Sequence, residues 1–438
     1  MVSLIIQEIK QLKSSHKNRV LIIFWTMALL ALIINYTQSY HEYLGGNAVD
    51  IQDIQEAKER ALKEIDGFEW SNESEKEGVK KASADCYDAM AEVFCTVQEH
   101  DDRKLLSAVH SYLKSEEALV RAYGYDIAHD RYEQVRVEAT EAFRDYMYGY
   151  YSQLEIAAGE FWHYDRMVGF NFLYHAMEDA MPIACIVVAL LAVVDGFAGE
   201  KESGSIKAKL LLPVSKGKLL AARIVGGTLY NAAALFLPLL LLFLLVGGIQ
   251  GFGSKDYLVL EDCAGIKTAE AIDGKLDNFD IYSYTITYSK DFELAGKYCV
   301  GISQFLVGQD FEDKEGITPV PNGRLVFSSI WKFLLRASLY QVLVILFSVS
   351  VGNFLSIFAN RRGIATAAGL IVALVFCVVP SRGSGMFLIS PGTYKSGVGI
   401  LGGTAGVTAL HAVSFLLASL LVLWAAMVVI QRRRDTVC

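Results

Sequence analysis

Long apolar runs alternate with polar stretches along this chain of 438 residues. A helix needs about 20 apolar residues to cross the hydrocarbon core of a bilayer. Runs that approach this length predict transmembrane helices at residues 19–35, 183–197, 219–247, 333–358, 364–379 and 409–430. Because 53% of the residues are hydrophobic and the mean hydropathy is positive, the composition also favours a membrane protein over a soluble one.

The polar stretches have their own periodicity. Between the first two apolar runs, helical spacing predicts long helices at about 49–65, 75–99, 102–122 and 129–160. Between the third and fourth runs, alternation over 281–288 and a strand-like stretch over 298–306 predict β-structure. The fold class that follows is an α-helical polytopic membrane protein. It has six transmembrane helices, a mostly helical outer domain and a second, β-containing outer insert.

These patterns divide the chain into five parts. They are a surface helix with the first span at 1–36, the outer helical domain at 37–181, the second and third spans with their loop at 182–248, the second outer insert at 249–330, and the last three spans with a broken segment at 331–438. The broken segment, 381–408, is rich in Gly and Ser. It predicts either short helices that dip into the outer leaflet or a plain outer loop.

The first residues of the chain have an amphipathic pattern. Ile5, Ile9 and Leu12 repeat at helical spacing, and Glu8 and Lys10 belong to the opposite face. This pattern predicts a helix over 3–17 that lies on the inner membrane surface. The alternative is that these residues only begin the first span.

Charge is distributed unevenly between the segments. Residues 37–181 hold about 30 acidic and about 14 basic side chains, and residues 248–330 hold about 13 and about 7. The short segments 1–19, 198–223, 359–363 and 431–438 together hold about 15 basic and about 4 acidic ones. Short basic loops are retained on the cytoplasmic side, so we expect both termini inside and the acidic domains outside. The net charge of −8 argues against a nucleic-acid partner.

The chain has seven cysteines. Four of them, Cys86, Cys95, Cys263 and Cys299, fall in the predicted outer segments, where disulfides can form. Cys263 with Cys299 is the preferred pair, and free thiols are the alternative. Cys86 and Cys95 belong to one predicted helix, in which a separation of nine residues prevents a bridge.

No catalytic or metal-binding motif is present in the sequence. The string nearest to a phosphate-binding loop is 199–205, but Ser205 stands where that loop needs its lysine, so we expect no ATPase site in this chain. Asp195 and Arg336 are ionisable residues near the ends of predicted spans. Such residues have either a functional or a purely structural role.

The loop between the second and third spans is the most informative stretch. Its residues Ser203 and Gly204 allow a bend. Ile206, Leu210 and Leu211 then form an apolar face, Lys207 and Lys209 form a basic one, and Pro213 ends the helix. Ser215 can cap the next helix. The product is a short amphipathic helix on the inner side, or else an ordinary basic loop.

This loop resembles the signature of the type-2 ABC transporter permease family. The matching positions are Glu200-Lys201-Glu202, Gly204-Ser205, Leu210-Leu211 and Pro213-Val214-Ser215-Lys216, in order and spacing. The resemblance implies a permease that pairs with a separate ATP-binding subunit, which would bind the ATP and Mg²⁺, and with a second permease copy in a homo- or heterodimer. It implies that the loop is a coupling helix docked on the ATPase, with Glu200, Lys201, Glu202, Gly204, Ser205, Lys207, Lys209, Pro213, Val214 and Ser215 at the contact or shaping it.

We therefore expect an exporter of a peptide, a lipid or a hydrophobic drug, in a bacterial cytoplasmic membrane. Two alternatives remain open at this point. In one, the motion of a partner ATPase drives movement of the outer domain, and no compound is transported through the membrane. In the other, the outer domain is a receptor, although no predicted cytoplasmic segment is long enough for a signalling domain. A membrane enzyme is a poor alternative, because no pairing of a nucleophile with a base stands out.

Overall fold

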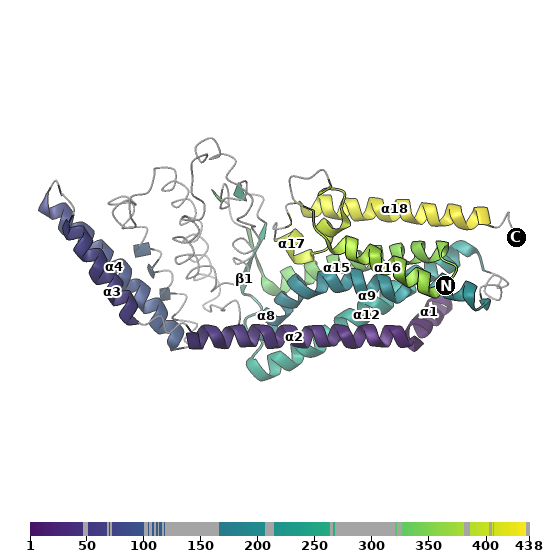
Figure 1. Ribbon diagram of the computed structural model, residues 1–438, viewed down its shortest axis with the longest axis horizontal. Helices are drawn as coiled ribbons and strands as arrows, with labels where there is room; N and C mark the ends of the chain where they lie inside the picture. The colour runs from purple at the N-terminus through teal and green to yellow at the C-terminus, as the bar shows by residue number, and fades with distance from the viewer. Residues whose placement is uncertain are drawn as a thin grey trace. The chain divides into compact units, whose positions relative to one another are not determined.

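The computed structural model of the protein (Figure 1) contains two compact units. Unit 1 comprises Met1–Ile34, Val168–Gly253 and Trp331–Cys438, and unit 2 comprises Asn35–Met167 and Ser254–Ile330. The residues that the structure describes are 1–46, 51–67, 70, 72–99, single positions between 104 and 118, 166–205, 214–262, 266–267, 320–321, 326–380, 386–402, 405 and 407–434.

Unit 1 is a helical bundle. Its helices are α1 (Val2–Ser14), α2 (His16–Gly46), α8 (Gly169–His175), α9 (Met181–Val193), α10 (Gly196–Glu202), α12 (Lys216–Gln250), α15 (Ile330–Phe358), α16 (Arg362–Cys377), α17 (Gly397–Leu401) and α18 (Ala409–Arg434). A π-helical turn, η1 (Ala176–Ala180), joins α8 to α9, and a 3₁₀ turn, η4 (Pro391–Tyr394), precedes α17. In Figure 1, α9, α12, α15 and α16 lie alongside one another.

Five helical stretches are long and apolar enough to cross a membrane: His16–His41, Gly169–Glu202, Lys216–Gln250, Ile330–Phe358 and Ala409–Ile430. They coincide with the predicted first, second, third, fourth and sixth spans, so the chain is a polytopic helical membrane protein. The predicted fifth span corresponds to α16, which has only 16 residues. At about 1.5 Å per residue, α16 falls short of the hydrocarbon core. The count of six spans therefore stays a prediction.

The second helical stretch begins earlier than the sequence indicated. The predicted start was residue 183, after two acidic residues and Pro182, whereas the helix begins at Gly169 and passes through η1. Pro182 stands in the first turn of α9, directly after the π-turn, so it does not end the helix. Two aromatic side chains before it, Phe172 and Tyr174, are fully buried.

Close helix packing centres on residues 190–194, at the C-terminal end of α9. Glycines from three neighbours approach this turn: Gly227 of α12, Gly352 of α15 and Gly369 of α16. A Cβ atom added to Gly352 would lie 2.9 Å from the carbonyl oxygen of Leu190, so only glycine permits this approach. Small residues have the same role in membrane bundles generally, because lipid removes the hydrophobic drive and leaves van der Waals packing.

Tryptophan from α2 stabilises α12 beside its internal proline. Pro238 has no N–H, so the carbonyl of Ala234 loses its helical donor. Next to it, the indole Nε1 of Trp25 donates to the carbonyl of Leu235 at 3.0 Å, and Trp25 itself is buried. The indole thus adds a bond between α2 and α12 next to the proline, and it binds a different carbonyl from the one that Pro238 leaves free.

A short segment of the predicted broken region, residues 391–401, packs on the C-terminal end of α16. It contains η4 and α17, so short helices are present there, as one of the two alternatives predicted. The ammonium of Lys395 donates to the carbonyl of Cys377, one of the last carbonyls of α16, at 2.5 Å. Tyr340 of α15 donates to the carbonyl of Tyr394 at 2.8 Å and fixes the segment from the other side. These contacts satisfy a backbone carbonyl at the end of α16 and another in the segment itself.

Unit 2 contains a helical hairpin made of α3 (Ile51–Gly67) and α4 (Glu73–Gln98), close to two predicted helices. Ile54 and Ile65 of α3, with Val79 and Val93 of α4, are buried. Asp66 accepts hydrogen bonds from Lys80 and Lys76 near the hairpin turn, and these bonds hold the pKa of its carboxyl below the usual range. Cys86 and Cys95 both lie in α4, as predicted.

Two antiparallel strand pairs are also described in unit 2. Strand β1 (Leu258–Asp262) pairs with β4 (Val326–Ser329), and β2 (Ile266–Lys267) pairs with β3 (Val320–Pro321). The strands predicted over 281–288 and 298–306 lie outside the described residues, as do the predicted helix over 129–160 and most of the one over 102–122. A mostly β insert therefore stays a prediction.

Gly392 provides a test of how the segment 391–401 meets α16. A Cβ atom at this position would lie 2.0 Å from the backbone carbonyl oxygen of Val378, and backbone cannot yield as a flexible side chain does. We expect Gly392→Ala to cost about 1–3 kcal/mol and to lower the midpoint of thermal unfolding in detergent. Gly363→Ala is the control, since nothing lies within 4 Å of its added Cβ. Equal midpoints for the two variants would contradict this packing.

Candidate functional site

The candidate site is built around α10, the short helix that follows the second long helical stretch. Gly204 has φ of +70°, a left-handed conformation that ends the helix and that glycine adopts without strain. The N–H groups of Ser203 and Gly204 donate to the carbonyls of Gly199 and Lys201 at 3.0 and 3.1 Å. The predicted bend at Ser203-Gly204 is thereby confirmed. We call α10 and the helix ends bound to its side chains the α10 junction.

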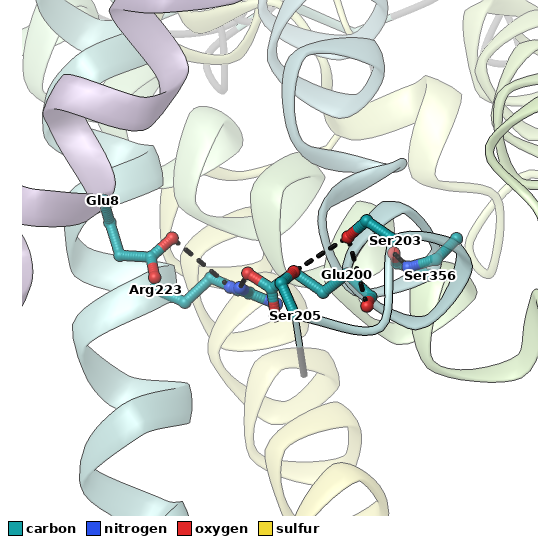
Figure 2. A network of polar contacts seen from close by, with 7 residues as sticks. Glu8, Glu200, Ser203, Ser205, Arg223 and Ser356 are labelled. Atoms are coloured by element: carbon teal, nitrogen blue, oxygen red, sulfur yellow. Dashed lines mark hydrogen bonds and ion pairs between the residues drawn. The ribbon is translucent and has the colours of Figure 1, made fainter. Parts of the chain in front are cut away.

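A buried arginine is the centre of the α10 junction. The guanidinium of Arg223, on α12, donates through Nη2 to the carboxylate of Glu200 on α10. Its Nε atom lies 3.4 Å from Oε2 of Glu8 on α1. Figure 2 shows Arg223 between these two carboxylates, so one side chain connects three helices.

All three side chains of this ion network are removed from solvent. Glu8, Glu200 and Arg223 are 6%, 4% and 4% exposed. The guanidinium also lies 3.9 Å from the centre of the Phe197 ring, a cation–π contact that covers its face. Each buried charge costs several kcal/mol in lost hydration, which only close pairing offsets. Arginine suits this position because its planar fork reaches two partners at once.

The next two residues of α10 bind two other helices. The ammonium of Lys201 donates to the carbonyls of Ile357 and Ala359, at the C-terminal end of α15, at 2.5 and 3.0 Å. A cation is favoured there by the helix dipole and by the unsatisfied carbonyls. Glu202 accepts, through Oε2, the N–H of Arg362 at the start of α16 at 2.9 Å. A carboxylate is favoured at that end for the converse reason.

The start of α10 is also fixed by its neighbours. The hydroxyl of Ser356, on α15, accepts the N–H of Ala198 at 3.1 Å, one of the donors that a helix start leaves free. Asp195 is the N-cap residue of α10, and its carboxylate accepts from Lys17 of α2 at 2.5 Å. The α10 junction therefore binds α1, α2, α12, α15 and α16, and a displacement of α10 must strain contacts to each of them.

With this geometry established, comparison with protein families decides the class. The profile described as ABC-2 family transporter protein matches residues 8–260, more than half of the chain. The protein belongs to the ABC-2 transporter family. Comparison with curated proteins and with solved structures finds no match. The matched range includes Glu8, α10 and Arg223, and thus much of the α10 junction.

Several residues that the sequence singled out in this ABC-2 family protein lie at the junction. Glu200, Lys201 and Glu202 each bind a different neighbour, and Gly204 and Ser205 follow them at the surface. Lys207, Lys209 and Pro213 lie outside the described residues, as do Leu210 and Leu211. Val214 and Ser215 lie at the start of α12.

Ser215 occupies the expected N-cap position of α12, but its side chain makes no cap hydrogen bond. The carbonyl of Ser215 accepts instead, from the N–H groups of Lys218 and Leu219 at 2.9 and 3.1 Å. The hydroxyl cap predicted from the sequence was therefore wrong. A serine in this position offers a cap without being required to form one, because the backbone carbonyl already begins the helix.

Other expectations lie outside this site. The preferred disulfide between Cys263 and Cys299 stays a prediction, because neither residue is among those described. Within the described ranges, no group of three or more His, Cys, Asp and Glu side chains is placed to hold a metal ion.

The sequence did not single out the residues that complete the junction. Glu8 was assigned to the polar face of the surface helix, yet it is buried against α12. Lys17 and Arg223 were counted only as basic residues of short inner segments. Their partners are 178 and 23 residues away along the chain, so no local pattern indicates them. An arginine within the first turns of an apolar helix was the one available signal.

Removal of the Arg223 guanidinium tests whether the network supports the fold. Arg223→Met leaves two buried carboxylates without the arginine, and we expect a loss of about 3–5 kcal/mol of stability. The measurement is the thermal unfolding midpoint of the purified protein in detergent. Arg361→Met, which changes an exposed arginine beside α16, should shift that midpoint little. Equal shifts would show that the buried network is not needed for stability.

Proposed function

We propose that this ABC-2 family protein is the permease subunit of an ATP-driven exporter, and that the α10 junction passes the motion of a partner ATPase to the membrane helices. One observation carries the proposal: three consecutive charged residues of α10 bind three different helices, α12, α15 and α16. A short element attached in this way cannot move without moving several spans. The family membership supports an ABC permease as the class of protein.

In this proposal the partner docks on the segment that follows α10, residues 203–215. Ser203, Gly204 and Ser205 are exposed, whereas Glu200 and Lys201 face the interior of the junction. Glu200 and Lys201 therefore transmit motion and do not contact the partner. The residues that contact the partner ATPase are then the exposed ones and Lys207 and Lys209, and Pro213 and Val214 shape the turn. This division refines the expectation from the resemblance, which placed Glu200 at the contact with the partner.

ATP would act by stabilising one arrangement of the permease over another, since a ligand shifts an equilibrium only by its differential affinity. In our proposal the partner subunit binds ATP and Mg²⁺, and a second permease copy, identical or homologous, completes the pathway. The transported compound would be a peptide, a lipid or a hydrophobic drug. We place both termini in the cytoplasm of a bacterial cell, with unit 2 outside, on the charge distribution.

The first test asks whether an ATP-binding subunit accompanies the protein. The full chain carries an affinity tag, is extracted in mild detergent from cells of its own organism, and is purified. We expect an ATP-hydrolysing subunit to co-purify, because the coupling segment needs a stable docking partner. A second purification, under conditions that strip peripheral subunits, should lose both that subunit and the activity. If no nucleotide-binding subunit appears under gentle conditions, the proposal fails.

Charge reversal in the docking segment tests where the partner binds. We expect Lys207→Glu with Lys209→Glu to reduce the co-purified ATP-binding subunit at least tenfold, because opposed like charges weaken an interface by several kcal/mol. Lys10→Glu with Lys13→Glu is the control, since it reverses two exposed charges on α1. Quantitative mass spectrometry gives the ratio of the two subunits. An unchanged ratio in the first variant would place the docking surface elsewhere.

A further inference from the structure

The α10 junction connects the coupling segment to the first long helix, α2, as well as to the helices that follow it directly in the chain. We propose that Arg223 and Glu8 are positioning residues that make α1 move with α10, and that α1 in turn moves α2. This inference rests on the proposed function and extends it to a part of the chain about 190 residues away from the coupling segment.

The first step of this route is the ion network. Glu200 is on α10, Arg223 is near the start of α12, and Glu8 is in the middle of α1. The contact to Glu200 is a hydrogen-bonded ion pair, and the contact to Glu8 is 3.4 Å long. Because water is excluded from all three groups, their attraction is screened little, and a shift of one charge is felt by the others.

The second step is the close contact between α1 and α12. A Cβ atom on Gly226 would lie 3.2 Å from Cβ of Glu8 and 3.3 Å from the carbonyl oxygen of Ile5. Gly226 is three residues after Arg223, so both belong to one face of α12. The backbone of α1 thus rests on the same helix face that holds the arginine. Little free space is left between α1 and this face of α12, so a movement of Arg223 displaces α1.

The third step is the corner between α1 and α2. The last carbonyls of α1 accept from side chains at the start of α2: Asn18 Nδ2 donates to Leu12 O at 3.1 Å, and Arg19 donates to Lys13 O and Ser14 O at 3.4 Å each. Asn18 is 1% exposed. These hydrogen bonds make α1 and α2 move as one rigid unit, because a change in the angle between the two helices breaks the bonds.

Direct evidence for such a route requires that a change at one end alter the other. The test uses the full permease with its co-purified ATP-binding subunit and follows amide hydrogen exchange in peptides from residues 2–14 and 196–205. The probe is ATP with orthovanadate, compared with no nucleotide. In the wild type we expect exchange in both peptides to change on trapping.

Glu8→Gln removes one charge and keeps the shape of the side chain. We expect the response of 196–205 to persist in this variant and the response of 2–14, measured as the change on trapping relative to exchange without nucleotide in the same variant, to fall at least fivefold. Arg223→Lys keeps the positive charge but removes the planar guanidinium that reaches two carboxylates. It should reduce the response of 2–14 by the same factor. Lys10→Gln, an exposed charge on the same helix, should respond as the wild type does.

The outcomes separate the two hypotheses. If α1 in Glu8→Gln responds as it does in the wild type, or if wild-type α1 does not respond while 196–205 does, the route through Arg223 is wrong and the proposed function survives. If no ATP-binding subunit co-purifies, or if 196–205 itself does not respond, the proposed function fails and the route fails with it. A merely structural role of Glu8 would alter exchange without nucleotide and leave the response to trapping intact.

Discussion

The guanidinium of Arg223, held out of water between two carboxylates, is the interaction on which the rest of the junction depends. A charge in this environment is costly unless its partners are close and fixed. The partners come from different helices, so the requirement for pairing becomes a requirement on where α1, α10 and α12 lie. Burial of one charged group thereby determines the relative placement of three helices that no covalent turn could align.

The same physical rule operates at other helix ends of unit 1. A helix leaves its first N–H groups and its last carbonyls unsatisfied, and where a helix end is packed against its neighbours these groups need partners from them. Lys201 donates to carbonyls at the end of α15, and Ser356 accepts an N–H group at the start of α10. Lys395 donates to a carbonyl at the end of α16. The backbone carbonyls of Gly251 and Phe252 likewise accept the N–H groups of Gly169 and Phe170 at the start of α8. Helix ends are thus completed by neighbours, and the neighbours become mechanically connected.

This arrangement gives the acidic–basic–acidic sequence at 200–202 a physical meaning. In a solvated loop these residues would be free to meet a partner, but here each one binds a different helix of its own chain. Contacts of this kind suit a short helix that must transmit force, because hydrogen bonds and ion pairs at helix ends resist displacement along several directions. The exposed residues after Gly204 then remain available to a second protein.

The sequence by itself determined the class of protein and the approximate course of the chain. Apolar length predicted five of the long helices, because crossing a bilayer demands it, and Ser203-Gly204 predicted a bend, because the backbone conformation of glycine is a local property. The signature at 200–216 indicated the family that the comparison confirmed. Local patterns did not reveal the continuation of a helix from Gly169 through η1, since the acidic residues and Pro182 resemble a boundary. Only the tertiary structure decided that Glu8 is buried, that Arg223 is shared and that Lys17 binds Asp195. Those pairings depend on which helices lie side by side, and periodicity along one helix carries no information about that.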